Sequence, residues 1–226
     1  WKRKGDCADV STHRPVSLLP AVARLVERTI VDQITAHLEK TGSLPQEQHG
    51  YRKAHSCETA VAHMLDVATT ERGKNKTVLI ATFDAQGAFD GVSHSILLEK
   101  LEKQAGVTGD ALRLIASFLD GRKQRVRVAG GKKSQWSELT RGTPQGAVWS
   151  PTLWAVAIAD LPKRIEGEVV CLADDVNVVV SDRDPNKARA KINKVMADVS
   201  SYMRTNRILP AAHKTQLLVV PRLRRK

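Results

Sequence analysis

Apolar residues recur at intervals of three or four along much of the chain, which is the spacing of one face of a helix. The first such run includes Leu18, Val22 and Leu25, continues to Leu38 and stops before Gly42, a residue type that commonly ends helices. The predicted helices cover residues 18–41, 57–72, 93–106, 108–119, 150–161 and a long segment that begins at Pro185 with Asp184 as its N-cap. The N-terminal third of the chain is therefore expected to be helical.

Short apolar runs rich in β-branched residues lie between these helices and predict strands. They cover residues 77–83, 168–173, 176–180 and 216–220. The first of them ends at Asp84, and the second and third are joined at Asp174–Asp175. A further alternating segment, Arg125–Val128, precedes Gly130–Gly131 and predicts a hairpin with one basic face.

The composition of the chain indicates what kind of partner it binds. The chain has 226 residues with 36 Lys and Arg against 24 Asp and Glu, a formal net charge of +12. This excess indicates a polyanionic partner, nucleic acid first and an anionic membrane surface second. Because 42% of the residues are hydrophobic and 27% are charged, a basic disordered tail is excluded and a folded domain with a core is expected.

The cysteines and the apolar runs indicate the compartment. Cys7, Cys57 and Cys171 are far apart and form no CxxC pair, which favours a reducing environment over a disulfide framework or a zinc site. No apolar run has the length needed to cross a bilayer, and no leader-like segment is evident. We expect an intracellular protein without a membrane partner, and an excerpt of a longer polypeptide.

The pair Asp174–Asp175 interrupts an apolar run that should otherwise be buried sheet. A carboxylate in such a place is costly unless a cation compensates it, and Lys, Arg or a divalent metal could do so. The alternative is an ordinary acidic turn exposed at the edge of the sheet.

A second strand ends in the same way at Asp84, and Asp90 follows six residues later. If this strand pairs beside the Asp174–Asp175 hairpin, three carboxylates meet at one edge of the sheet. Such a group suits two hard cations that bridge a phosphoryl group, and so predicts in-line phosphoryl transfer. For Asp90 we favour a helix-start or turn role over a ligand role.

Several segments of the chain resemble motifs of the reverse transcriptases. Three segments are similar to their motifs A, B and C in the same order: Phe83–Asp90, Thr143–Gly146 with Ser150–Pro151, and Leu172–Asp175. Others resemble finger motifs of non-long-terminal-repeat (LINE-type) retrotransposon enzymes and motif D: Arg14–Leu19, Gln48–Lys53, His55–Thr59 and Lys214–Thr215. Together these segments span nearly the whole chain.

The resemblance implies an α+β fold, a right-hand polymerase with fingers and palm, in which helices back an antiparallel palm sheet and the thumb is absent. It divides the chain into four parts. These are residues 1–76 as fingers, 77–121 as palm, 122–146 as a basic hairpin and motif B loop on the fingers side, and 147–226 as the rest of the palm.

The resemblance also implies a metal site. Asp84 and Asp174 would be the principal ligands of two Mg²⁺ ions, for which Mn²⁺ could substitute, with Asp175 nearby and the carbonyl of Ala85 contributing. Lys214 would lie near the pyrophosphate as a charge stabiliser or proton donor. Without the resemblance, a solvated lysine is the default for Lys214.

The remaining implied roles concern the nucleotide. Arg52 would contact the triphosphate with Lys53 assisting, since guanidinium matches phosphate oxygens. The ring of Phe89 would lie under the sugar, and Gln145–Gly146 would lie beside the templating pair, where glycine allows close approach. The alternatives without a nucleotide role are that Phe89 is a core aromatic residue, that Lys53 is solvated, and that the motif B segment is a simple turn.

The function implied is an RNA-directed DNA polymerase core of a retrotransposon, extending a DNA primer 3′-hydroxyl with dNTPs on an RNA template. The missing thumb and accessory domains would belong to a longer polyprotein, and a nuclear location follows from the resemblance alone. One alternative is a weak or inactive relic that binds RNA, since Leu172 replaces the usual aromatic residue. Another is a basic structural protein whose acidic pairs are turn residues.

Overall fold

The computed structural model describes residues 2–3, 13–14, 16–127 and 131–223. Cys7, Pro15 of the first finger motif, residues 128–130 of the expected hairpin and the basic run Arg224–Lys226 lie outside the described residues. The helices are α1 (Ala21–Lys40), α2 (Cys57–Gly73), α3 (Ala88–Gly91), α4 (His94–Lys103), α5 (Gly109–Leu119), α6 (Trp149–Ala157) and α7 (Pro185–Thr205), with 3₁₀ turns η2 (Pro162–Arg164) and η3 (Ala212–Lys214). The strands are β1 (Lys2–Arg3), β2 (His13–Arg14), β3 (Thr77–Gln86), β4 (Lys123–Gln124), β5 (Ser137–Glu138), β6 (Glu168–Leu172), β7 (Asp175–Asp182), β8 (Leu209–Pro210) and β9 (Gln216–Val220).

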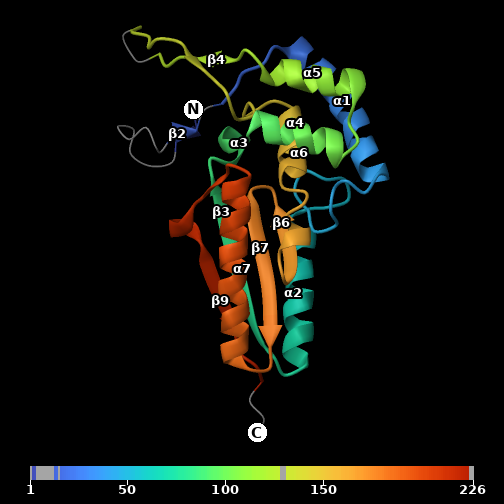
Figure 1. The fold of residues 1–226 in the computed structure, drawn as a ribbon, viewed down its shortest axis with the longest axis vertical. Coiled ribbons are helices and arrows are strands. Elements are labelled where there is room, and N and C mark those ends of the chain that lie inside the picture. The colour runs from blue at the N-terminus through green and yellow to red at the C-terminus, as the bar shows by residue number, and fades with distance from the viewer. Residues whose placement is uncertain (1, 4–12, 15, 128–130, 224–226) are drawn as a thin grey trace.

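An antiparallel sheet forms the lower half of the molecule in Figure 1. Its strands run in the order β6, β7, β3 and β9, and the short β8 pairs with the far end of β3. The hairpin β6–β7 is the one predicted around the Asp174–Asp175 pair, and β3 is longer than predicted because it continues past Asp84 to Gln86. The mixed helices and antiparallel sheet confirm the α+β class.

Helices cover both faces of this sheet, and the alternation of β3 explains why. Leu79 and Ala81 belong to the main core together with Ile192 of α7, whereas Val78 packs with Ala68 of α2 on the opposite face. Figure 1 shows α7 and α2 running along the sheet. Helix α2 belongs to residues 1–76, which the resemblance assigns to the fingers, yet it lies against the sheet. The division of the chain into four parts stays a prediction.

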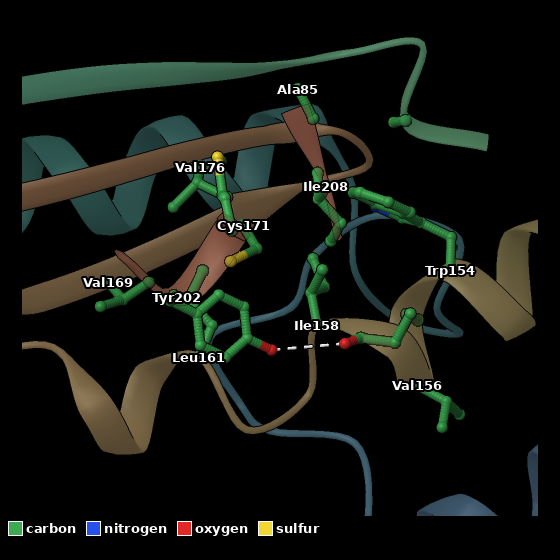
Figure 2. Close-up of a cluster of buried hydrophobic side chains, with 14 of the residues drawn as sticks. Ala85, Trp154, Val156, Ile158, Leu161, Val169, Cys171, Val176, Tyr202 and Ile208 are labelled. Atoms are coloured by element: carbon green, nitrogen blue, oxygen red, sulfur yellow. Dashed lines mark hydrogen bonds between the residues drawn. The ribbon is translucent and has the colours of Figure 1, made fainter. Parts of the chain in front are cut away.

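The main core continues under the end of the sheet that contains Asp84 of β3. Trp154 is fully buried there, with Cys171 and Ile208 in the same cluster, and Figure 2 shows their side chains. Burial raises the pKa of the Cys171 thiol to about 12, which makes it a packing residue with no thiolate chemistry at neutral pH. Tyr202 donates a hydrogen bond to the Ala157 carbonyl at 3.3 Å (Figure 2).

The upper half of Figure 1 contains α1, α4, α5, α6 and the hairpin β4–β5. The apolar stripe predicted for the first helix is only partly buried: Leu18, Val22 and Leu25 are 87%, 74% and 70% exposed, and Leu38 is completely buried. The hairpin strand is Lys123–Gln124, two residues earlier than the predicted alternation. Across the described residues, no helix combines the length and apolar character that a bilayer span requires.

Candidate active site

Three carboxylates meet at one edge of the sheet. Strands β3 and β7 pair in a register that places Asp84 directly opposite Asp175, and Asp174 stands in the turn immediately before β7. The turn is tight because Ala173 adopts a left-handed conformation with φ of 56°. The predicted convergence of the three carboxylates is thereby confirmed.

The only cation among the described residues that pairs with this edge is Lys214 from η3, whose Nζ lies 2.5 Å from Asp84 Oδ2. Asp175 is exposed, yet loss of hydration around its carboxyl group, and then the charges of Asp174 and Asp84, raise its pKa, with Lys214 acting in the opposite direction. One lysine facing three carboxylates leaves the edge with excess negative charge.

This edge suits a hard divalent cation, since its donors are carboxylate oxygens and its charge is under-compensated. Within the part of the chain that is described, no three His, Cys, Asp or Glu side chains are already arranged around a metal position. The reason at this edge is that Asp84 directs an oxygen to Lys214. The residue types and the charge therefore fit a hard divalent cation, for which the second oxygen of Asp84 is not engaged by Lys214.

Two other segments hold the turn that carries Asp174. Trp154 of α6 donates its indole N–H to the Ala173 carbonyl at 2.7 Å. On the other side Gly50 packs against Ala173 so closely that a Cβ at Gly50 would lie 2.2 Å from the Ala173 nitrogen. The neighbouring backbone pairs with β6, since His49 N–H bonds to the Cys171 carbonyl at 2.7 Å.

A cavity of about 510 Å³ lies between α1, the loop of Tyr51 and the motif B loop. Its lining includes Arg24, Arg28, Tyr51, Phe89, Gln145 and Gly146. The rings of Tyr51 and Phe89 meet edge to face at 6.3 Å. Tyr51 is 55% exposed, yet loss of hydration around its hydroxyl, and then the charge of Asp174, raise its pKa, so this cavity residue feels the field of the carboxylate edge.

The motif B loop forms one wall of this cavity. Its Gly146 has φ of 110°, and a Cβ there would lie 2.8 Å from the Ser17 carbonyl oxygen, so both conformation and space require glycine. The Gln145 side chain donates to Asp90 Oδ2 at 2.8 Å. Asp90 thus positions an amide and is separate from the three carboxylates, in agreement with the non-ligand role favoured for it.

Arg52 pairs with an acidic residue of α1 in this structure. Its Nε and Nη2 form a bidentate pair with Glu39, each at 2.7 Å, and its Nη1 donates to the Pro45 carbonyl at 2.5 Å. The side chain is 5% exposed. All three guanidinium nitrogens of Arg52 are engaged, so Arg52 ties the loop to α1, and its contact with the triphosphate stays a prediction. Lys53 is exposed and does not line the cavity.

The cations that do line the cavity are Arg24 and Arg28, which the motifs did not indicate. Their spacing of four on a predicted helix was the available signal, since it places both on one face of α1. Tyr51 and Trp154 were also missed, although Tyr51 is inside a finger motif. Nothing in the sequence marks Trp154, because its hydrogen bond is to a backbone atom 19 residues away.

Solved structures share this fold. The apo telomerase of Candida tropicalis, truncated from its C-terminal domain, superposes with a TM-score of 0.63 at 12% identity, covering 88% of this chain and 41% of that one. The telomerase of Candida albicans in complex with a TWJ fragment of telomeric RNA gives a TM-score of 0.59 at 15% identity, over 87% and 35%. The fold is therefore the fingers-and-palm fold of polymerases.

The sequence comparison is more specific. A profile of the family described as reverse transcriptase (RNA-dependent DNA polymerase) matches residues 2–223, so the chain belongs to the reverse transcriptase family. It is a domain of the LINE type, similar to the RNA-directed DNA polymerase from mobile element jockey of Drosophila funebris (34% identity, 76% of this chain and 19% of the relative). The Drosophila melanogaster jockey polymerase is 30% identical over 85% of this chain and 20% of its own length. The chain thus spans about a fifth of the length of these relatives.

Proposed function

We propose that this domain is the catalytic core of an RNA-directed DNA polymerase that adds deoxynucleotides to a primer 3′-hydroxyl under two Mg²⁺ ions. The observation that carries the proposal is the register of β3 and β7, which sets Asp84 opposite Asp175 with Asp174 one residue away. Family membership and the polymerase names of the relatives support the same activity.

In the proposed reaction the primer 3′-oxygen attacks the α-phosphorus of a dNTP, the bond from that phosphorus to the bridging oxygen breaks, and pyrophosphate leaves. Asp84, Asp174 and Asp175 would hold the metal. Bound Mg²⁺ supplies charge neutralisation of the phosphates and a more acidic 3′-hydroxyl, and Mn²⁺ can replace it. Lys214, which pairs with Asp84 in this structure, would stabilise the charge of the leaving pyrophosphate or donate a proton to it.

The cavity lined by Phe89 and Gln145 is the proposed nucleotide site. A volume of about 510 Å³ is in the range of small-molecule sites. The half-buried Phe89 ring would offer a flat surface to the sugar, and Gln145 and Gly146, which line the same cavity, would lie beside the templating pair. Arg24 and Arg28 on its wall supply permanent positive charge for phosphate oxygens.

Primer extension on an RNA template with Mg²⁺ or Mn²⁺ tests this function. Asp84→Asn and Asp174→Asn should each lower extension about 100-fold or more, because charge stabilisation by a metal is worth several kcal/mol. Asp66→Asn, which removes an exposed carboxylate on α2, is the matched control and should extend like the unchanged chain.

A titration with Mn²⁺ on the same proteins separates the alternatives. Loss of binding in both active-site variants, with binding retained in Asp66→Asn, supports one shared metal site. RNA binding without extension by the unchanged chain would favour the inactive relic. Equal Mn²⁺ binding in all the proteins would favour a structural protein whose acidic residues are turn residues.

A further inference from the structure

We propose that the hairpin β4–β5 and the groove at its base bind the unpaired RNA template strand before it reaches the nucleotide cavity. This proposal rests on the polymerase function above and adds a binding surface for one particular strand. The hairpin projects from the upper end of the molecule, far from α2 and the C-terminus (Figure 1).

Charge is concentrated in this segment. Residues 122–141 hold seven Lys and Arg against a single Glu, so they supply +6 of the net +12 of the whole chain. The cations are Arg122, Lys123, Arg125, Arg127, Lys132, Lys133 and Arg141. A density of this kind on a projecting element is the electrostatic signature of a phosphate-binding surface.

Two of these cations line a groove of about 360 Å³ at the base of the hairpin. Arg122, Gln124 and Arg141 line one side, and the motif B loop with Gln145 lines the other. Among the described residues, no carboxylate forms an ion pair with Arg122 or Arg141. Both guanidinium groups are therefore available to phosphate oxygens. Asp90 also lies in the groove, where its carboxylate accepts the Gln145 amide.

Gln145 connects the groove with the nucleotide cavity, because it lines both. A strand whose backbone follows Arg122 and Arg141 would pass over Gln145 and bring its next base to the cavity that Phe89 lines. The groove is therefore placed on the path of a template and is not an isolated basic patch.

An exposed indole on the hairpin indicates that the strand is unpaired. Trp136 is 59% exposed, and the Arg125 guanidinium covers its ring at 4.4 Å from the centroid. Base faces are available for stacking on an aromatic ring in single strands, whereas a duplex hides them between neighbouring pairs. An arginine stacked on the same ring adds a phosphate contact beside the base.

The stem is ordered well enough to present these groups. The Leu139 N–H bonds to the Arg122 carbonyl at 2.8 Å, and Ser134 and Val126 bond to each other through the Ser134 amide at 2.8 Å and its hydroxyl at 2.9 Å. These bonds fix Trp136 and Arg125 on a common frame, so binding requires little further ordering of the hairpin.

Fluorescence anisotropy with a labelled single-stranded RNA, titrated at several KCl concentrations, tests the proposal. Arg122→Gln/Arg141→Gln should reduce the slope of log affinity against log salt by about 1.4, since each phosphate contact on a single strand contributes about 0.7. The matched control is Lys187→Gln/Arg189→Gln, which removes the same charge from exposed positions near the start of α7, outside the hairpin and its groove, and should keep the slope.

Trp136→Ala should weaken binding about 5- to 100-fold at every salt concentration with the slope unchanged, the loss expected for one stacked base. Trp136→Phe should restore most of the affinity, which a merely structural role for the indole would not produce. The unfolding temperatures of all variants should match that of the unchanged chain, because the altered side chains lie at the surface or line an open groove.

Two results would overturn the proposal: a salt slope in the Arg122/Arg141 variant equal to that of the α7 control, or an equal loss of affinity for a blunt RNA duplex. Primer extension on the same preparations keeps the two proposals apart. Extension that persists while hairpin variants bind RNA like the unchanged chain refutes the hairpin proposal alone. Hairpin-dependent RNA binding without any extension refutes the polymerase proposal alone.

Discussion

The contact between Gly50 and Ala173 makes the position of the catalytic turn sensitive to a single methyl group. A Cβ at Gly50 would lie 2.2 Å from the Ala173 nitrogen, while ordinary van der Waals contacts begin at 3.4 Å, so the two backbones would have to separate by about 1.2 Å. The segment before Gly50 is bonded to β6, and the strain therefore falls on the turn that carries Asp174. Gly50 does not have a positive φ, so the substitution acts through this clash alone.

A displacement of about 1 Å in a catalytic group costs about 100-fold in rate. We therefore expect Gly50→Ala to lower kcat for primer extension with Mg²⁺ about 100-fold, while overpacking lowers the free energy of unfolding by about 1–3 kcal/mol. Gly73→Ala, where no atom lies within 4 Å of the added Cβ, is the control and should extend like the unchanged chain. Extension by Gly50→Ala within about threefold of that control would refute the reasoning.

Three further changes test the fold around the site. Arg52→Lys replaces the two-bond contact with Glu39 by a single ammonium group and should lower the free energy of unfolding in urea by about 1–2 kcal/mol. An unchanged urea midpoint would contradict the role of Arg52 in tying the loop to α1. Lys100→Met removes the buried cation 2.6 Å from Asp160 and leaves Arg164 at 3.3 Å, so it should cost about 1–3 kcal/mol in thermal unfolding; a neutral result would mean that Arg164 compensates Asp160 fully. Two lysines and a serine lower the pKa of Glu71 from its ordinary value of 4.5 to about 2, so its contribution to stability is complete above pH 4.5 and is lost as the pH falls toward 2. Glu71→Gln should remove about 1–2 kcal/mol of that acid dependence, and pH curves that coincide for both proteins would show that Glu71 contributes none of it.

Local signals were enough to predict most elements. The strand Gln216–Val220 has the predicted bounds, and α7 begins at Pro185 with the Asp184 side chain accepting the Asn186 amide, as the capping pattern predicts. Each of these features depends on neighbours within a few residues. The carboxylate edge was predictable for a related reason, since the strand that carries Asp84 and the hairpin that carries Asp174 and Asp175 need only pair with each other to bring the charges together.

Features that depend on distant partners were not predictable. The periodicity of the first helix correctly predicts a helix, yet it cannot tell which apolar residues are covered, and Leu18 and Val22 are exposed in the structure. Arg52 carries the residue type expected for phosphate binding, but its partner is Glu39, which lies 13 residues earlier and on another element. Only the folded arrangement of loop and helix shows that pairing.

The distant contacts also explain how the site can be rigid although its carboxylates repel one another. The rings of Tyr51, Phe89 and Trp154 form a continuous series with centroids 6.3 and 6.0 Å apart, and the last ring bonds to the backbone of Ala173. This series joins the floor of the nucleotide cavity to the turn that carries Asp174. A nucleotide bound in this cavity as proposed would contact Phe89, whose ring packs on the Trp154 side chain that holds this turn. The structure thus links Phe89, the proposed sugar contact, to the turn of Asp174 through one side chain, Trp154.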